Sequence, residues 1–193
     1  MTPPATPLEW AAIYAGFGWR TLPIKPNGKH PPMASWQHAA TVDPDTHAKW
    51  WNGLYRNHGI GIATGDELWV LDIDTHDADG PATLRALEAE HGTLPLGPTS
   101  TTGGGGEHRL FLPPPGRHVG TTKNIGPGLD VRGRGGQIVA PPTIHATTGV
   151  PYSWKVAPDT PLRRAPLWLE QLVIVGGTPC PHCGSTNTRR IPT

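Results

Sequence analysis

The sequence has few cysteines and little net charge, and each shortage excludes a class of protein. Its two cysteines are Cys180 and Cys183, and a single C-x-x-C pair is a poor basis for the disulfide framework of a small secreted domain. The formal net charge is only +1. This excludes the strongly basic balance of a domain that binds nucleic acid through overall charge alone.

The sequence also lacks a long apolar run. No stretch approaches the ~18 consecutive apolar residues of a transmembrane helix. The first nine residues contain no basic flank followed by an apolar segment, which a secretory signal requires. We therefore expect a cytoplasmic protein with no membrane partner.

Glycine and proline are abundant instead. The 25 Gly and 24 Pro make up about a quarter of the chain, a share at which disorder becomes a competing interpretation. Eight Trp and a hydrophobic fraction of 36% argue against disorder, because disordered chains combine few aromatic residues with high net charge. Gly does not recur at every third position, which excludes collagen. So much Gly and Pro also disfavours long helices, and the composition predicts a loop-rich globular domain of short strands.

Helical and extended patterns follow one another without strict alternation, which predicts the α+β class. Helices are expected at residues 7–18, 43–51 and 80–91. Residues 165–175 are expected to form a helix or a strand, and their length and Pro166 favour the helix. Strands are expected at residues 19–24, 59–64, 67–74, 108–112, 128–131, 136–140 and 152–156. Residues 7–175 are expected to form one folded domain, with a flexible N-terminus at 1–6 and a polar tail at 176–193.

The segment LWVLDIDTHD contains the strongest indication of a functional site. Asp72 and Asp74 are two residues apart on an expected strand, so their carboxylates point to one face with Cα atoms ~6.5 Å apart. Two carboxylates at this separation can hold one or two divalent ions. The alternative is a solvated acidic strand end, although two acids on one face repel each other unless a cation lies between them.

A run of four glycines precedes a histidine. Gly103–Gly106 lets the backbone approach a ligand closely and direct N–H groups at an anion, and the run leads into His108 and Arg109 on an expected strand. A phosphate is the ligand that this arrangement suits best. The alternative is a flexible hairpin tip with an incidental histidine.

The segment GLDVRGRGG contains an acid with no acidic neighbours. Asp130 lies between two apolar residues, and Arg132 is two positions further on, so both side chains share a face of the expected strand. Asp130 is therefore a candidate third metal ligand. An Asp130–Arg132 surface ion pair is an equally good interpretation of this segment alone. Three carboxylates, an anion-binding turn and basic residues together fit two-metal nucleotidyl transfer.

In this order the motifs resemble those of the primase/polymerase (prim-pol) domains of phage and plasmid replication proteins, within the archaeo-eukaryotic primase superfamily. An acid-x-acid motif matches Asp72-Ile73-Asp74, a small residue two positions before His matches Gly106-Glu107-His108, and a hydrophobic residue before Asp matches Leu129-Asp130. The flanking segments GWRTLPIKPNGKHPP, GIGIATG and YSW also fit, and the resemblance covers about residues 8–172.

The resemblance implies a fold and an activity. The fold is an RRM-like catalytic sheet packed with a smaller N-terminal α/β unit. The activity is that of a DNA-directed primase/polymerase, which uses Mg²⁺ or Mn²⁺, a single-stranded DNA template and dNTP or NTP. Such proteins often continue into a helicase, so a helicase domain or other replication proteins are the implied partners.

The resemblance also assigns roles by position. Asp72, Asp74 and Asp130 are the expected metal ligands, and His108 is expected to contact the incoming triphosphate. The turn glycines Gly105 and Gly106 are expected to bind the nucleotide with it. The glycine run is longer than the usual turn of the family, which bears on nucleotide selection.

Further residues are candidates for nucleic-acid or phosphate contacts. Lys29 and Arg132 are candidates for phosphate contacts, with a solvated turn lysine as the alternative for Lys29. Trp36 is the Trp most available to stack on a base, and His145 is expected to be structural. Four other Trp are expected in the core: Trp10, Trp50, Trp51 and Trp168.

The tail contains half of a zinc site. Cys180 and Cys183 in CPHCG form a C-x-x-C knuckle, and a closed Zn²⁺ site needs two more ligands. The sequence has no second such pair. Either the partner knuckle lies outside this sequence or the tail binds no metal.

Two other functions compete with nucleotidyl transfer. LDIDT resembles the first motif of haloacid-dehalogenase-type phosphatases, in which Asp72 would be the nucleophile. That chemistry needs a lysine and a later acidic pair, whereas the acids after Glu107 are the widely separated Asp130, Asp159 and Glu170. The second alternative is a primase-like module that binds template or nucleotide without catalysis.

Overall fold

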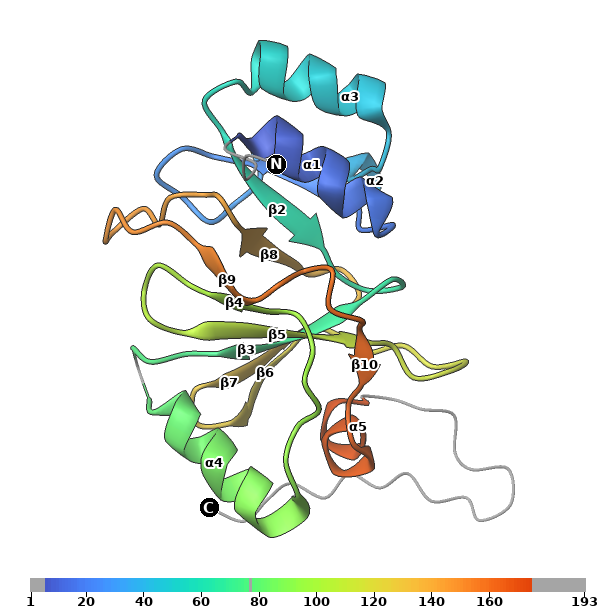
Figure 1. Cartoon of the computed structure of the whole chain (residues 1–193), viewed down its shortest axis with the longest axis vertical. Helices are drawn as coiled ribbons and strands as arrows, with labels where there is room; N and C mark the ends of the chain where they lie inside the picture. Colours follow the sequence, from blue (N-terminus) through green and yellow to red (C-terminus); the bar gives the residue numbers. More distant parts are fainter. Residues whose placement is uncertain (1–5, 77, 175–193) are drawn as a thin grey trace.

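The computed structural model describes residues 6–76 and 78–174 of the chain, and they form two β-sheets with helices around them (Figure 1). The smaller sheet has the strand order β1-β2-β8, and the larger one has the order β6-β7-β3-β5-β4-β9, with β10 pairing to β5. All strand pairs are antiparallel except β10 with β5. The strands of the smaller sheet are β1 (Thr21–Ile24), β2 (Gly59–Ala63) and β8 (Gln137–Ala140). Those of the larger sheet are β3 (Trp69–Ile73), β4 (Thr99–Thr101), β5 (Glu107–Leu112), β6 (Thr122–Gly126), β7 (Leu129–Arg132), β9 (Ser153–Val156) and β10 (Arg163–Arg164).

The helices divide between the two ends of the molecule (Figure 1). Those near the smaller sheet are α1 (Pro7–Gly16), α2 (Trp36–Ala39), α3 (Pro44–Lys49) and its wider continuation η1 (Trp50–Leu54). We call these helices and the smaller sheet the N-terminal unit. The helices at the far side of the larger sheet are α4 (Gly80–His91) and α5 (Leu167–Val173). Among the described helices the longest has 12 residues, and none combines the length and apolar character of a transmembrane span.

The side chains of β3 point alternately to the two faces of the larger sheet, and each face packs in a different hydrophobic cluster. Trp69, Leu71 and Ile73 pack in one cluster with residues of α4 and α5. Val70 packs in another cluster with residues of α1, β2 and β8. Since successive side chains of a strand point to opposite faces, Asp72 shares the face of Val70, which the N-terminal unit covers.

The helix ends follow from capping. Asp43 accepts a hydrogen bond from the Thr46 N–H at 2.9 Å at the start of α3, and Asp79 accepts one from the Ala82 N–H at 2.8 Å at the start of α4. Gly92, with a φ of 96°, ends α4. The α+β class, the three expected helices and the helix favoured at residues 165–175 are therefore confirmed.

The structure corrects several expected boundaries. β3 ends at Ile73, so Asp74 lies just beyond the strand and not on it. The segment of residues 92–142 does contain short strands joined by turns, as expected, but β4 and β6 within it were not predicted. The short elements α2 and β10 were not predicted either.

Candidate active site

The register of the larger sheet brings together side chains that are far apart in sequence. The Cα partners of Asp72 on β3 are His108 on β5 and Asp130 on β7. His108 in turn has Ser100 on β4 as its partner. Residues directly opposite each other on neighbouring strands have their side chains on the same face. Ser100, His108, Asp72 and Asp130 therefore form one row across four strands, which we call the Asp72 row.

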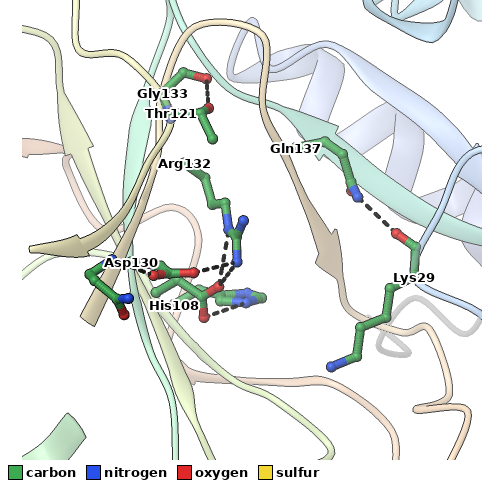
Figure 2. Close-up of polar contacts among 9 residues, drawn as sticks. Lys29, His108, Thr121, Asp130, Arg132, Gly133 and Gln137 are labelled. Atoms are coloured by element: carbon green, nitrogen blue, oxygen red, sulfur yellow. Dashed lines mark hydrogen bonds and ion pairs between the residues drawn. The ribbon is translucent and has the colours of Figure 1, made fainter. Parts of the chain in front are cut away.

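A guanidinium group links the two carboxylates of this row (Figure 2). Arg132 donates to Asp72 Oδ2 from Nε at 3.1 Å and from Nη2 at 2.8 Å. The same Nη2 donates to Asp130 Oδ2 at 3.1 Å. The structure shows the ion pair of Asp130 with Arg132 and places Asp130 beside Asp72, whereas its role as a metal ligand stays a prediction. The two carboxylates converge on one cationic nitrogen.

His108 is held at the centre of the row. It is 6% exposed, with Nδ1 3.3 Å from Ser100 Oγ and Nε2 3.5 Å from Asp72 Oδ1. Burial lowers the pKa of His108, although the Asp72 charge raises it. The imidazole is therefore neutral near pH 7 and can donate one hydrogen bond while accepting another.

Asp74 is positioned by backbone contacts just after β3. Its N–H donates to the Gly128 carbonyl at 2.8 Å, and its carbonyl accepts from the Gly80 N–H at 3.0 Å. A Cβ on Gly80 would lie 2.4 Å from the Gly128 carbonyl oxygen, so only glycine permits this approach. The Asp74 side chain is exposed, and its charge raises the pKa of His108.

The glycine turn lies against the end of β3. A Cβ on Gly106 would be 2.5 Å from the Ile73 carbonyl oxygen, and Gly105 has a φ of +91°. The N–H groups of Gly105 and Gly106 donate to the carbonyl and the hydroxyl of Thr102, each at 3.0 Å. These two glycines therefore use their N–H groups to shape the turn.

Lys29 approaches the Asp72 row from the N-terminal unit. Its carbonyl accepts a hydrogen bond from Gln137 Nε2 on β8 at 2.8 Å, and in Figure 2 its side chain extends away from this contact on the side of the view where His108 lies. The Lys29 charge lowers the pKa of His108. Lys29 thus adds positive potential to the candidate site from a separate element.

The donor set suits a hard divalent cation. Carboxylate oxygens are the ligands that Mg²⁺ and Mn²⁺ prefer, and Asp72 and Asp130 already share one cationic partner. Within residues 6–76 and 78–174, no three acidic, imidazole or thiol groups are gathered as a metal site. Cys180 and Cys183 lie outside the described residues.

Sequence reasoning overlooked two residues of the site. Ser100 lies in the unpredicted strand β4. The β-branched Thr residues on either side of it are the feature of the sequence that could have indicated a strand there. The Tyr152 ring stacks on His108 with centroids 6.0 Å apart, and burial together with the charges of Asp72 and Asp74 raises its pKa to about 12. Tyr152 is thus a neutral wall of the site.

The Trp residues take the positions expected of them. Trp51 is buried, and the other three expected core Trp, which are Trp10, Trp50 and Trp168, are partly buried against apolar clusters. Trp36 is half-buried and borders a cavity of about 260 Å³ that Arg20 and Arg134 also line. It therefore remains a candidate for base stacking.

Similarity to known families agrees with this geometry. Residues 11–168 match the family model described as Prim-Pol, bifunctional DNA primase/polymerase, N-terminal. No individual curated protein matches the chain. The matched range covers well over half of the chain and includes the whole Asp72 row, Asp74 and Arg132, and it supports a primase/polymerase nucleotidyltransferase. The chain therefore belongs to the family of N-terminal bifunctional DNA primase/polymerase domains.

Proposed function

We propose that the chain is a template-dependent DNA primase/polymerase that extends or starts a primer in replication of the phage or plasmid type. One observation carries the proposal beyond the family: the register places Asp72, His108 and Asp130 in one row, with Arg132 across the two carboxylates. This is an acidic site with a neutral imidazole beside it, which suits a nucleotide whose phosphates are bound through cations.

Asp72, Asp74 and Asp130 would hold two Mg²⁺ or Mn²⁺ ions. When bound, such ions supply charge neutralisation of the triphosphate, a lowered pKa of the primer 3′-hydroxyl and stabilisation of the leaving pyrophosphate. Arg132 has five N–H donors, so it can exchange a carboxylate partner for a phosphate oxygen. Neutral His108 can donate to the triphosphate, and Lys29 contributes long-range attraction for it.

The fold that we propose is the archaeo-eukaryotic primase fold. The larger sheet with α4 and α5 behind it corresponds to the RRM-like catalytic sheet. The N-terminal unit faces the Asp72 row, so a single-stranded DNA template and the incoming dNTP or NTP would enter between the two sheets. A helicase domain or other replication proteins would act with the domain, in the cytoplasm.

Primer extension with Mg²⁺ or Mn²⁺ tests the proposal. We expect the unsubstituted chain to extend a labelled primer and the Asp72→Asn, Asp74→Asn double variant to show no extension. Asp159→Asn is the matched control, because Asp159 is an exposed acid between β9 and β10, outside the Asp72 row, and it should leave extension unchanged.

The other outcomes identify the competing functions. Extension that survives the double substitution would refute the polymerase proposal. Absence of extension by either protein, with template binding intact, would indicate a binding module without catalysis. Release of inorganic phosphate from small phosphoesters, without extension, would indicate the phosphatase alternative with Asp72 as nucleophile.

A further inference from the structure

His145 was expected to be structural, yet one of its ring nitrogens has no hydrogen-bond partner in the described part of the chain. The residue is 4% exposed. Its Nδ1 accepts a hydrogen bond from the Thr148 N–H at 3.3 Å. Thr148 Oγ1 also lies 3.2 Å from Nδ1, and it donates its own hydrogen to the Gly103 carbonyl. The Thr148 N–H can only donate, so it favours the tautomer with the ring hydrogen on Nε2, which can then donate to a ligand. Nε2 hydrogen-bonds to no group among the described residues. The fully enclosed polar side-chain atoms without a partner there are Arg109 Nε and Gln137 Oε1, so Nε2 is open to solvent and to a ligand.

The free edge of this ring lies against the first half of the glycine turn. A Cβ on Gly104 would be 3.6 Å from His145 Nε2 and 2.9 Å from His76 Nε2, and a Cβ on Gly103 would be 2.3 Å from His145 Cβ. Two imidazole rings therefore border the Gly103–Gly104 backbone, in space that any side chain there would fill.

The same two glycines keep their N–H groups available. Neither Gly103 nor Gly104 donates a backbone hydrogen bond within the described part of the chain. Thr148 Oγ1 donates to the Gly103 carbonyl at 2.8 Å. Since the C=O and N–H of a trans peptide point in opposite directions, this bond turns the Gly104 N–H away from Thr148.

Positive charge and ring stacking connect the region around His145, Gly103 and Gly104 to the candidate active site. Tyr152 stacks on His108 and also lies 5.9 Å from the His145 ring, centroid to centroid. The Gln137 hydrogen bond to its carbonyl holds Lys29 beside this region. Burial lowers the pKa of His145, and the Lys29 charge lowers it further, which places Lys29 within electrostatic reach of the ring. An anion that touches both His108 and His145 must extend past Tyr152, which suits a chain of phosphates better than a single phosphate.

We propose that His145 Nε2, the N–H groups of Gly103 and Gly104, and Lys29 form an anion site that binds the outer phosphates of a nucleoside triphosphate. The identity of the ligand rests on the proposed polymerase function, whereas the anion site itself does not. His145 is then a substrate-binding residue and not only a packing residue.

The test measures binding of inorganic tripolyphosphate to the full chain without divalent ions, by calorimetry. His145→Phe keeps a ring against Gly103 and Tyr152 but removes the donor, so the dissociation constant should rise about tenfold or more, the effect of one hydrogen bond to a charged group. His145→Gln, with an amide N–H near the Nε2 position, should recover most of the affinity. His91→Phe on α4, behind the larger sheet, is the control and should bind as the unsubstituted chain does.

Unchanged tripolyphosphate binding by a folded His145→Phe variant would overturn the proposal. If this variant does not fold, the ¹⁵N chemical shift of His145 Nε2 is measured in the unsubstituted chain instead. A chemical shift that does not change when tripolyphosphate is added would also overturn the proposal. Primer extension separates the two proposals. If anion binding depends on His145 but the chain extends no primer, the polymerase proposal is refuted and the anion site stands. If His145→Phe extends a primer with an unchanged KM for dNTP, the anion site is refuted and the polymerase proposal stands.

Discussion

Replacing Arg132 with methionine tests whether the Asp72 row needs a cation. Arg132 makes three charge-assisted hydrogen bonds to Asp72 and Asp130, and the three side chains are 26%, 13% and 21% exposed. Removing one partner of a fully buried pair costs about 3–5 kcal/mol, and partial exposure reduces this by screening. We expect Arg132→Met to lower the free energy of unfolding by about 2–3 kcal/mol, because two carboxylates are left facing each other without a cation.

The matched control lies two residues further along the chain. Arg134 makes an ion pair of the same length, 2.8 Å, with Asp66, but these side chains are 55% and 57% exposed. Arg134→Met should therefore cost less than about 1 kcal/mol. Urea unfolding followed by Trp fluorescence in the presence of EDTA measures both values.

Divalent ions should distinguish repulsion from lost packing. Mg²⁺ or Mn²⁺ should stabilise Arg132→Met more than the unsubstituted chain, in which the guanidinium competes for the same carboxylates. Adding Asp130→Asn to Arg132→Met should recover part of the lost stability, because only one carboxylate remains. If Arg132→Met and Arg134→Met have equal effects and metal stabilises neither, then the two carboxylates do not form a preorganised cation site and the reasoning is wrong.

Three further predictions concern stability and use the same unfolding assay. Burial lowers the pKa of His47, so the unfolded chain binds a proton more readily; stability should fall as pH drops below about 6.5, and less steeply in His47→Gln. Tyr14 is fully buried, and its hydroxyl donates to the Pro141 carbonyl at 2.8 Å and accepts from Trp154 Nε1 at 3.0 Å. Tyr14→Phe should lower the free energy of unfolding by about 1–3 kcal/mol, and an unchanged value would show that these partners bind water instead. Gly106→Ala should cost about 1–3 kcal/mol because its Cβ meets a β3 carbonyl oxygen at 2.5 Å, whereas Gly16→Ala, with nothing within 4 Å, should be neutral or slightly stabilising.

Local patterns in the sequence predicted the parts of the site that depend on one segment alone. The alternation in LDVR places Asp130 and Arg132 on one face of β7, and the capping signals at Asp43 and Asp79 define where α3 and α4 begin. The placement of Asp74 failed because it depends on a distant segment. Its N–H pairs with Gly128, 54 positions later, and this contact replaces the continuation of β3.

The alignment of strands that are far apart in the chain could not be predicted from the sequence. His108 can face Asp72 only if β5 pairs with β3 in one particular alignment, and a shift by one residue would turn His108 to the opposite face. Two other strands of this sheet, β4 and β6, lack the alternating apolar residues by which a strand is usually predicted. β4 is three small polar residues, and β6 is an edge strand with no fully buried side chain, so neither shows the apolar alternation that identifies a strand.

The glycine run shows how one sequence motif can contain two physical roles. The four residues of the run, Gly103 to Gly106, are identical in the sequence, and the family resemblance made Gly105 and Gly106 the expected ligand contacts. In the structure those two provide the positive φ and the close approach to β3, and their N–H groups are engaged by Thr102. The N–H groups that remain for an anion belong to Gly103 and Gly104, beside His145. Packing also requires Gly103, because a Cβ there would lie 2.3 Å from the Val150 carbonyl oxygen. Gly104 is therefore the glycine of this run whose missing side chain leaves room for a ligand, between the His76 and His145 rings.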